Sequence, residues 1–282
     1  LNCNQHGISG STGCSASAVA YCFALGLGEW NAKLAHLGVL GALGDSFLTG
    51  GELSDLNSEL VSLARTQGSV SVNGEYRFQL SQDVGAMQLI ACLDALGSVG
   101  YYKGGPDIAI KGLLDNQIEA LLTSGQQYLD HQHQLFTKFV ESSALSVTGE
   151  LEWFNLTDSF GEVGVKTVGL LCNYLLEQQV ASGAHYLAGF QYICDQIPGM
   201  GPVEFNQSKL SMRIPHALRP AVESGDLPSL DQLLPAVAGA AGGFVDACHP
   251  YAAAVTVGRG AEETFIERLN SALLSYLSLG SE

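Results

Sequence analysis

Apolar residues in the first half of the chain recur at helical spacing. Positions 16, 19, 20, 23 and 27 lie on one helical face, and Ser15 is suited to cap that helix. A second helix is predicted from Asn31 to Asp45; it is apolar almost all the way round, which is typical of a buried helix. Further helices are predicted over 53–67, 86–96 and within 107–142, with a short hairpin around Asn73 and Gly74. We therefore expect a mainly helical first half.

The pattern changes near residue 143. Residues 145–156 alternate and favour a strand, and further strands are predicted at 186–194, 209–214 and 251–257. Helices are predicted at 163–177, at 229–241 and in an amphipathic segment at the end of the chain. Alternating strands and helices predict an α/β fold with a mixed sheet, so we expect two domains, 1–142 and 143–282.

Composition and charge restrict the class of protein. The 282 residues are 46% hydrophobic and 14% charged, which excludes a disordered, collagen-like or coiled-coil chain. The formal charge of -16 results mainly from the low count of 12 Lys plus Arg. A strongly acidic chain is not attracted to a phosphate backbone as a whole, so any contact with nucleic acid must be local.

The seven cysteines are scattered and form no CxxC pair, which favours free thiols over a disulfide framework or a zinc site. The sequence shows no signal peptide and no uninterrupted apolar run of about 18 residues. We therefore expect a cytoplasmic protein without a membrane partner. The first residue is Leu1, and the opening segment is typical of the middle of a loop, so we expect a fragment of a longer protein.

Asp45 is the first candidate for chemistry, because it ends an apolar helix. A carboxylate removed from water needs an ion partner, hydrogen bonds or a metal. The alternative is that Gly44 ends the helix and Asp45 is the first exposed residue of a loop.

His249 and Arg213 are candidates for binding phosphate. The pair Gly242-Gly243 precedes His249 at the entrance to a small-residue strand, which predicts a flexible turn with exposed backbone N–H groups. In residues 209–214 a period of two predicts that Ser211 and Arg213 share the face opposite the core, where they suit a phosphate. The alternatives are a structural histidine and a solvated arginine. His131 and His133 are two positions apart on a predicted helix and do not form a metal pair.

Taken in order, these segments resemble the DHH phosphoesterase superfamily. Residues 37–45, Leu-Gly-Val-Leu-Gly-Ala-Leu-Gly-Asp, resemble its fourth motif, and residues 13–21 resemble the small-residue helix that precedes it. Residues 50–57 are similar to the following segment of RecJ-like members, particularly archaeal ones. Residues 209–213 resemble the Ser-x-Arg strand of the DHH-associated C-terminal domain, and residues 242–257 are similar to its Gly-Gly-Gly-His motif.

The resemblance implies the helical C-terminal half of a DHH domain over 1–142 and a substrate-binding domain over 143–282. It further implies metal-dependent phosphodiester hydrolysis in the complete enzyme, as a single-strand nucleic acid exonuclease. Asp45 would bind Mn²⁺ or Mg²⁺, His249 would bind a phosphate, and Arg213 with Ser211 would position the next phosphate or base.

Three departures from the family pattern affect this inference. Residues 246–248, Asp-Ala-Cys, replace the three glycines, and Ala254 stands where a glycine is common. The family's N-terminal aspartates and its Asp-His-His motif have no counterpart in this sequence. Because Asp45 alone cannot form a two-metal site, we predict that this chain by itself is inactive.

Two other functions remain open. One is a catalytically inactive RecJ-like scaffold that binds replication proteins, which the acidity and the replaced glycines favour. The other is a phosphodiesterase for short oligonucleotides or cyclic dinucleotides, which needs no long basic groove.

Overall fold

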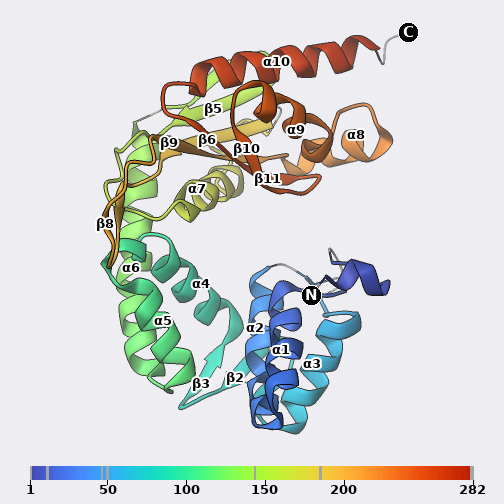
Figure 1. The fold of residues 1–282 in the computed structure, drawn as a ribbon, viewed down its shortest axis with the longest axis vertical. Coiled ribbons are helices and arrows are strands. Elements are labelled where there is room, and N and C mark those ends of the chain that lie inside the picture. Colours follow the sequence, from blue (N-terminus) through green and yellow to red (C-terminus); the bar gives the residue numbers. More distant parts are fainter. Residues whose placement is uncertain are drawn as a thin grey trace. The chain divides into compact units, whose positions relative to one another are not determined.

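The chain forms two compact units in a computed structural model that describes residues 2–10, 13–45, 47–48, 51–142, 144–183 and 186–279 (Figure 1). The first unit comprises Leu1–Asp94 and Asp107–Gln126, and the second comprises Ala95–Pro106 and Gln127–Glu282. The boundary expected near residue 142 lies at the end of helix α6 (Ile118–Glu141), whereas the two units divide within this helix. In the described part of the chain no helix has the length and hydropathy to cross a membrane.

The first unit begins with short helix η1 (Cys3–His6) and three helices, α1 (Ala16–Leu27), α2 (Ala35–Gly44) and α3 (Asp55–Thr66). A short helix, η2 (Glu29–Leu34), connects α1 to α2. The Ser15 side chain accepts a hydrogen bond from the N–H of Ala18, which confirms the predicted cap of α1. Helix α2 packs against both α1 and α3, as expected for a helix without a polar face.

Two glycines of α2, Gly38 and Gly41, face different helices. A Cβ at Gly38 would lie 2.6 Å from Cδ1 of Leu60 in α3, whereas a Cβ at Gly41 would collide with Ser17 of α1. Positions three apart differ by about 60° around a helix with 3.6 residues per turn, so successive glycines face different neighbours. These two glycines therefore allow helices to approach each other.

Residues after α3 form a small antiparallel sheet of β1 (Val70–Val72), β2 (Tyr76–Gln79) and β3 (Asp83–Gly85). The hairpin predicted around Gly74 is present, and Gly74 has the positive φ of 79° that favours glycine there. Strand β3 was not predicted, because three residues that include Asp83 carry no clear alternation. Helices α4 (Ala86–Gly97), η3 (Tyr101–Lys103), α5 (Gly105–Leu114) and α6 follow.

The second unit contains a mixed six-stranded sheet in the order β10-β11-β9-β6-β5-β4. Its strands are β4 (Ser146–Thr148), β5 (Leu151–Asn155), β6 (Tyr186–Tyr192), β9 (Gln207–Arg213), β10 (Phe244–Cys248) and β11 (Ala252–Gly258). Only β5 and β6 pair in parallel within this sheet. A separate short ribbon joins β7 (Gln196–Ile197) to β8 (Gly201–Pro202). The predicted α/β class, with a helical first half and a mixed sheet after it, is confirmed.

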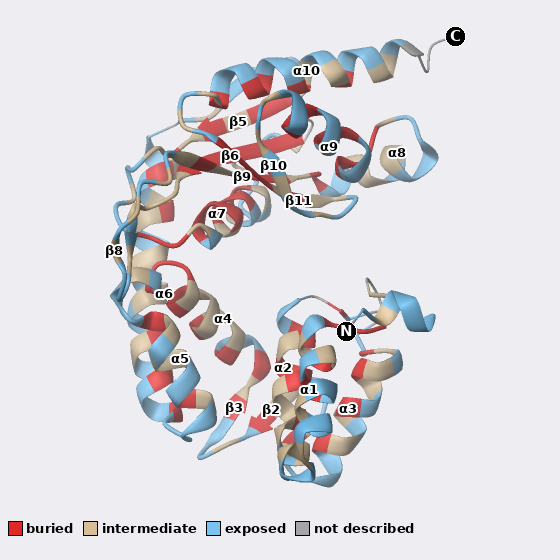
Figure 2. Ribbon diagram, viewed as in Figure 1, coloured by how far each residue is buried: buried red, intermediate tan, exposed pale blue. Residues whose placement is uncertain are grey.

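Helices cover the two faces of this sheet differently. Helices α9 (Leu230–Ala240) and α10 (Glu262–Leu279) pack on one face, and α7 (Lys166–Glu177) packs on the other (Figure 1). Short helices η4 (His216–Leu218) and α8 (Arg219–Ser224) follow β9. Buried residues follow the central strands (Figure 2). The sheet thus has a core on both sides of β6 and β9.

Two sequence predictions in this unit were wrong. Residues 145–156 form the β4–β5 hairpin and not one strand, because Gly149 turns the chain with a φ of 56°. The segment from Gly242 to His249 is not a flexible turn, because its residues 244–248 form the edge strand β10 paired with β11.

Candidate phosphate-binding face

Strand β9 carries polar side chains on the face of the sheet that α7 partly covers. Leu210 and Met212 are fully buried in the core beneath α9 and α10, so the alternating Ser211 and Arg213 lie on the opposite face. The predicted division of the two faces is confirmed. The face is not simply open to solvent, however, because α7 packs over part of it.

The guanidinium of Arg213 is held by three hydrogen bonds from two elements. Its Nε donates to Oδ1 of Asn173 on α7 at 2.7 Å. Its Nη1 donates to Oγ of Ser211 at 2.9 Å and to the carbonyl of Met212 at 2.8 Å. Among the residues that the structure describes, Nη2 has only a long contact of 3.4 Å, to the carbonyl of Gly169. The group is therefore oriented while Nη2 retains donor capacity.

Ser211 contributes to the orientation of Arg213 and has little surface of its own. The residue is only 5% exposed, and its hydroxyl oxygen accepts the hydrogen bond from Nη1. A Cβ at Gly169 would lie 3.0 Å from Nη2 of Arg213 and 3.1 Å from Oγ of Ser211, so glycine leaves room for the pair beneath α7. The neighbouring thiol of Cys172 is fully buried, and burial raises its pKa to about 12.

A floor of alanines separates Arg213 from His249. In the register of the sheet Arg213 pairs with Ala252, and the N–H of His249 donates to the carbonyl of Ala252 at 2.9 Å. One step along, Ser211 pairs with Ala254, which pairs with Ala247 of β10. Strands in a sheet lie about 4.8 Å apart, so Arg213 and His249 are about 10 Å apart along this row. We call Ala247, Ala252 and Ala254, the small residues in this row and in the neighbouring row of Ser211, the alanine trough.

A different row of the same face, at the start of β9, carries an ion pair. Nζ of Lys209 lies 2.7 Å from Oδ2 of Asp246, and that oxygen also accepts a hydrogen bond from Oγ1 of Thr256 at 2.9 Å. An unpaired carboxylate at Asp246 would repel a phosphate. In the structure its charge is balanced by Lys209, so the repulsion is reduced and Lys209 is largely occupied.

Strand β10 lies at the edge of the sheet, and the glycines Gly242 and Gly243 precede it. Gly242 has a positive φ of 71°, and a Cβ at Gly243 would collide with the carbonyl of Thr256. The register shifts between Val245 and Ala247, which is a β-bulge. In the described sheet β10 pairs with β11 along one side, so residues 244–248 form an edge strand and not the expected loop of N–H groups around a phosphate.

Asp45 lies in the first unit, at the C-terminal end of α2. Gly44 is the last helical residue and Asp45 is exposed, as the alternative interpretation expected. No group of three or more His, Cys, Asp or Glu side chains suited to a metal occurs within the described ranges. A catalytic metal pair needs several such ligands, so the residues described here do not fit a complete metal centre.

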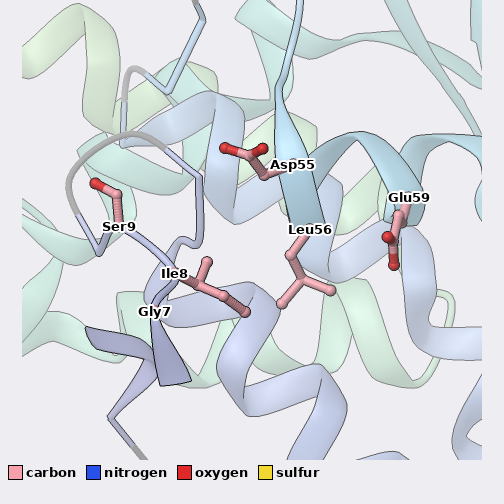
Figure 3. Close-up of a pocket in the computed structure, with 6 residues that line it drawn as sticks. All are labelled: Gly7, Ile8, Ser9, Asp55, Leu56 and Glu59. Atoms are coloured by element: carbon pink, nitrogen blue, oxygen red, sulfur yellow. The ribbon is translucent and has the colours of Figure 1, made fainter. Parts of the chain in front are cut away.

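A pocket in the first unit was not predicted from the sequence. It has a volume of about 490 Å³ and is lined by Gly7, Ile8, Ser9, Asp55, Leu56 and Glu59 (Figure 3). The loop that carries residues 7–9 forms one wall, and the first turns of α3 form the other. The segment of residues 50–57 had been singled out by resemblance, but nothing in its pattern indicated a partner near residue 8.

Comparisons with known proteins give distant matches among solved structures. No protein-family model and no curated protein sequence matches the chain. Among solved structures, a pGpG-specific phosphodiesterase, PggH from Vibrio cholerae, matches with a TM-score of 0.38 and 11% identity, over 70% of this chain and 61% of that one. CDC45 from Entamoeba histolytica matches with a TM-score of 0.43 and 9% identity, over 86% of this chain and 53% of that one. This chain spans less than two thirds of either protein, and at such TM-scores we base no conclusion on the likeness.

Proposed function

We propose that the chain binds the phosphate groups of a short single-stranded oligonucleotide in the alanine trough. The observation that supports the proposal is the oriented guanidinium of Arg213, which keeps donor capacity on Nη2. The alanine methyl groups give a shallow floor, and the exposed His249 stands across it as a second donor. A phosphate bound beside Arg213 gains charge-assisted hydrogen bonds from a group that is already in place.

The charge distribution favours a short ligand over a long polyanion. The chain carries a formal charge of -16, and Lys209 at the end of the trough is paired with Asp246. Long single strands gain affinity from many cationic contacts along a groove. A site that offers Arg213 and His249 suits one or two phosphates.

Phosphodiester hydrolysis is the activity that the DHH resemblance proposes for the complete enzyme, from the end of a single strand. Asp45 would supply one ligand to Mn²⁺ or Mg²⁺ in that reaction. Since the described residues do not form a complete metal centre, we expect this chain to bind the oligonucleotide without cleaving it.

A second candidate function is a protein-binding scaffold, such as one that assembles with replication proteins. The observation that favours it is an exposed apolar face at the end of α1, where Phe23, Leu27 and Trp30 are 57%, 62% and 71% exposed. Clustered apolar exposure of this kind marks protein interaction sites more often than nucleic-acid sites.

Calorimetric titration with a 5′-phosphorylated tetranucleotide tests the first proposal. We expect Arg213→Gln to weaken binding at least about tenfold, since charge-assisted hydrogen bonds contribute about 1.5–3 kcal/mol. Arg268→Gln is the matched control, because Arg268 is exposed on α10 across the sheet, and its variant should bind as the wild type does. Equal affinities of wild type and Arg213→Gln would exclude the trough as the site.

A cleavage assay in Mn²⁺ with the same tetranucleotide, a longer single strand and a cyclic dinucleotide tests the absence of hydrolysis. We expect no cleavage of any of the three. Robust Mn²⁺-dependent cleavage that Asp45→Ala abolishes would contradict this expectation.

A further inference from the structure

Cys3 and Cys14 are two free thiols that lie close together in the first unit, on either side in the sequence of the pocket residues Gly7, Ile8 and Ser9. Each thiol is reduced in the structure, and the Cys14 side chain is within hydrogen-bonding contact of that of Cys3. Two further contacts place them around the same segment. A Cβ at Gly10 would lie 3.3 Å from Sγ of Cys3, and the N–H of Cys14 donates to the carbonyl of Ser9 at 3.0 Å.

Two hydrogen bonds tie residues 8 and 10 back to residues 3 and 4. The N–H of Ile8 donates to the carbonyl of Cys3 at 3.2 Å, and the N–H of Gly10 donates to Oδ1 of Asn4 at 3.0 Å. The residues enclosed in this way include Gly7, Ile8 and Ser9, which form one wall of the pocket (Figure 3). A covalent link between residues 3 and 14 would therefore act directly on that wall.

We propose that Cys3 and Cys14 are a reversible oxidation site, at which a hydroperoxide forms a disulfide that fixes the wall of residues 7–9 against α3. The proposal concerns the first unit and does not depend on oligonucleotide binding in the second. It differs from a structural disulfide framework, because both thiols are free in the structure.

The exposure of the two residues sets the order of the chemical steps. Cys3 is half-buried, whereas Cys14 is buried, and burial raises the pKa of the Cys14 thiol to about 11. At neutral pH Cys14 stays protonated, so the hydroperoxide meets Cys3 first. The Cys3 sulfur takes up the hydroxyl oxygen and becomes a sulfenic acid, releasing water or an alcohol. The Cys14 sulfur then attacks the Cys3 sulfur and its thiol proton passes to the departing hydroxyl, so the S–O bond breaks, water leaves and the S–S bond forms.

The disulfide changes the pocket by removing conformations of its wall. Cross-linking residues 3 and 14 closes a short loop and restricts the backbone around Ile8 and Ser9. The opposite wall, with Asp55 and Leu56, belongs to α3, whose amides are engaged in helical hydrogen bonds. Oxidation should therefore slow amide hydrogen exchange in residues 3–10 and leave that of α3 nearly unchanged.

Treatment of the full chain with a small excess of hydrogen peroxide tests the site. We expect intact mass to fall by about 2 Da, the mass of two hydrogens, and peptide mapping to join Cys3 to Cys14. Dithiothreitol should restore the reduced mass. Amide exchange in residues 3–10 should slow at least about threefold in the oxidised protein, as expected for a restricted loop.

Three single variants separate the possible outcomes. Cys14→Ser should leave Cys3 as a sulfenic acid that dimedone traps, and Cys3→Ser should remove the reaction at this site. Cys22→Ser is the matched control, because Cys22 is an exposed thiol of α1, and this variant should form the link as the wild type does. Stable sulfenic or sulfinic acid at Cys3 in the wild type, or a disulfide through Cys22, would overturn the proposal.

Discussion

Arg213 owes its suitability for a ligand to side chains that restrain it before binding. An arginine on a surface loses rotamer freedom when it grips an anion, and that loss subtracts from affinity. Here Asn173 and Ser211 already hold Nε and Nη1, so most of that loss is incurred on folding. Because the guanidinium is planar, these contacts also fix the direction of the N–H groups on Nη2.

Asn173 acts on the ligand through Arg213 and is therefore a positioning residue. We expect Asn173→Ala to weaken tetranucleotide binding about threefold, the equivalent of one net hydrogen bond. The slope of log Kd against log salt concentration should not change, because the charge of Arg213 remains. Arg213→Gln should lower both affinity and slope. A slope for Asn173→Ala as low as that of Arg213→Gln would show that this role is misassigned.

Cys172, beneath Ser211, gives a test of the packing on this face. Its ordinary thiol pKa of 9.0 is raised by burial to about 12 in the folded chain. The folded state thus favours the protonated thiol, and this stability is fully present below pH 9 and is lost as pH rises toward 12. When the pH is raised above 9, the free energy of unfolding should fall less in Cys172→Ala than in the wild type. We expect the difference to be on the order of 1 kcal/mol per pH unit. Urea denaturation at pH 8 and pH 10 measures this, and parallel losses would contradict the burial of the thiol.

At the scale of elements, the close approach of α7 to β9 sets the position of Arg213. Helix α7 reaches the strand at Gly169, where any side chain would press on the guanidinium. The helix supplies both the space and, through Asn173, a hydrogen-bond acceptor. Displacement of α7 by a few tenths of an ångström should therefore affect ligand binding more than stability.

Gly169→Ala tests this dependence. Alanine favours a helix over glycine by up to about 1 kcal/mol, but its Cβ would press on Arg213 and Ser211, so we expect little net change in stability. Tetranucleotide affinity should fall at least about threefold, since Nη2 is the group displaced. Gly239→Ala in α9 is the control, because a Cβ there meets nothing within 4 Å; it should raise stability and leave affinity unchanged. Wild-type affinity of Gly169→Ala would contradict the role of α7.

The elements of this face were predictable to different degrees. The period of two in residues 209–214 was sufficient to place Ser211 and Arg213 on one face, because alternation reports which side is buried. It could not reveal α7, since the partner of a face depends on how distant segments pack. Strand β10 was missed because its glycine pair and the absence of a long apolar run are typical of a turn. Its pairing with β11, and not its own composition, makes it a strand.

At the scale of the whole molecule, acidity limits how much of a nucleic acid the chain can hold. The chain has a formal charge of -16, and Arg213 is the cation that we assign to the ligand in the trough. Phosphates outside the trough therefore gain little binding free energy. We expect the tetranucleotide and a 20-nucleotide single strand to show the same slope of log Kd against log salt concentration. For one or two phosphate contacts this slope is about 0.7 to 1.4, because Kd rises with salt concentration. A much steeper slope for the longer strand would indicate an extended groove.

The location of the bound oligonucleotide is the most direct test of the account. Amide hydrogen exchange of the full chain should be measured with and without saturating 5′-phosphorylated tetranucleotide. We predict slower exchange at the turn that holds His249 and Pro250 and at the adjoining ends of β9 and β11, with no change in residues 2–10 and 51–66. Slower exchange confined to the first unit, or no change at the trough under saturating ligand, would contradict phosphate binding beside Arg213.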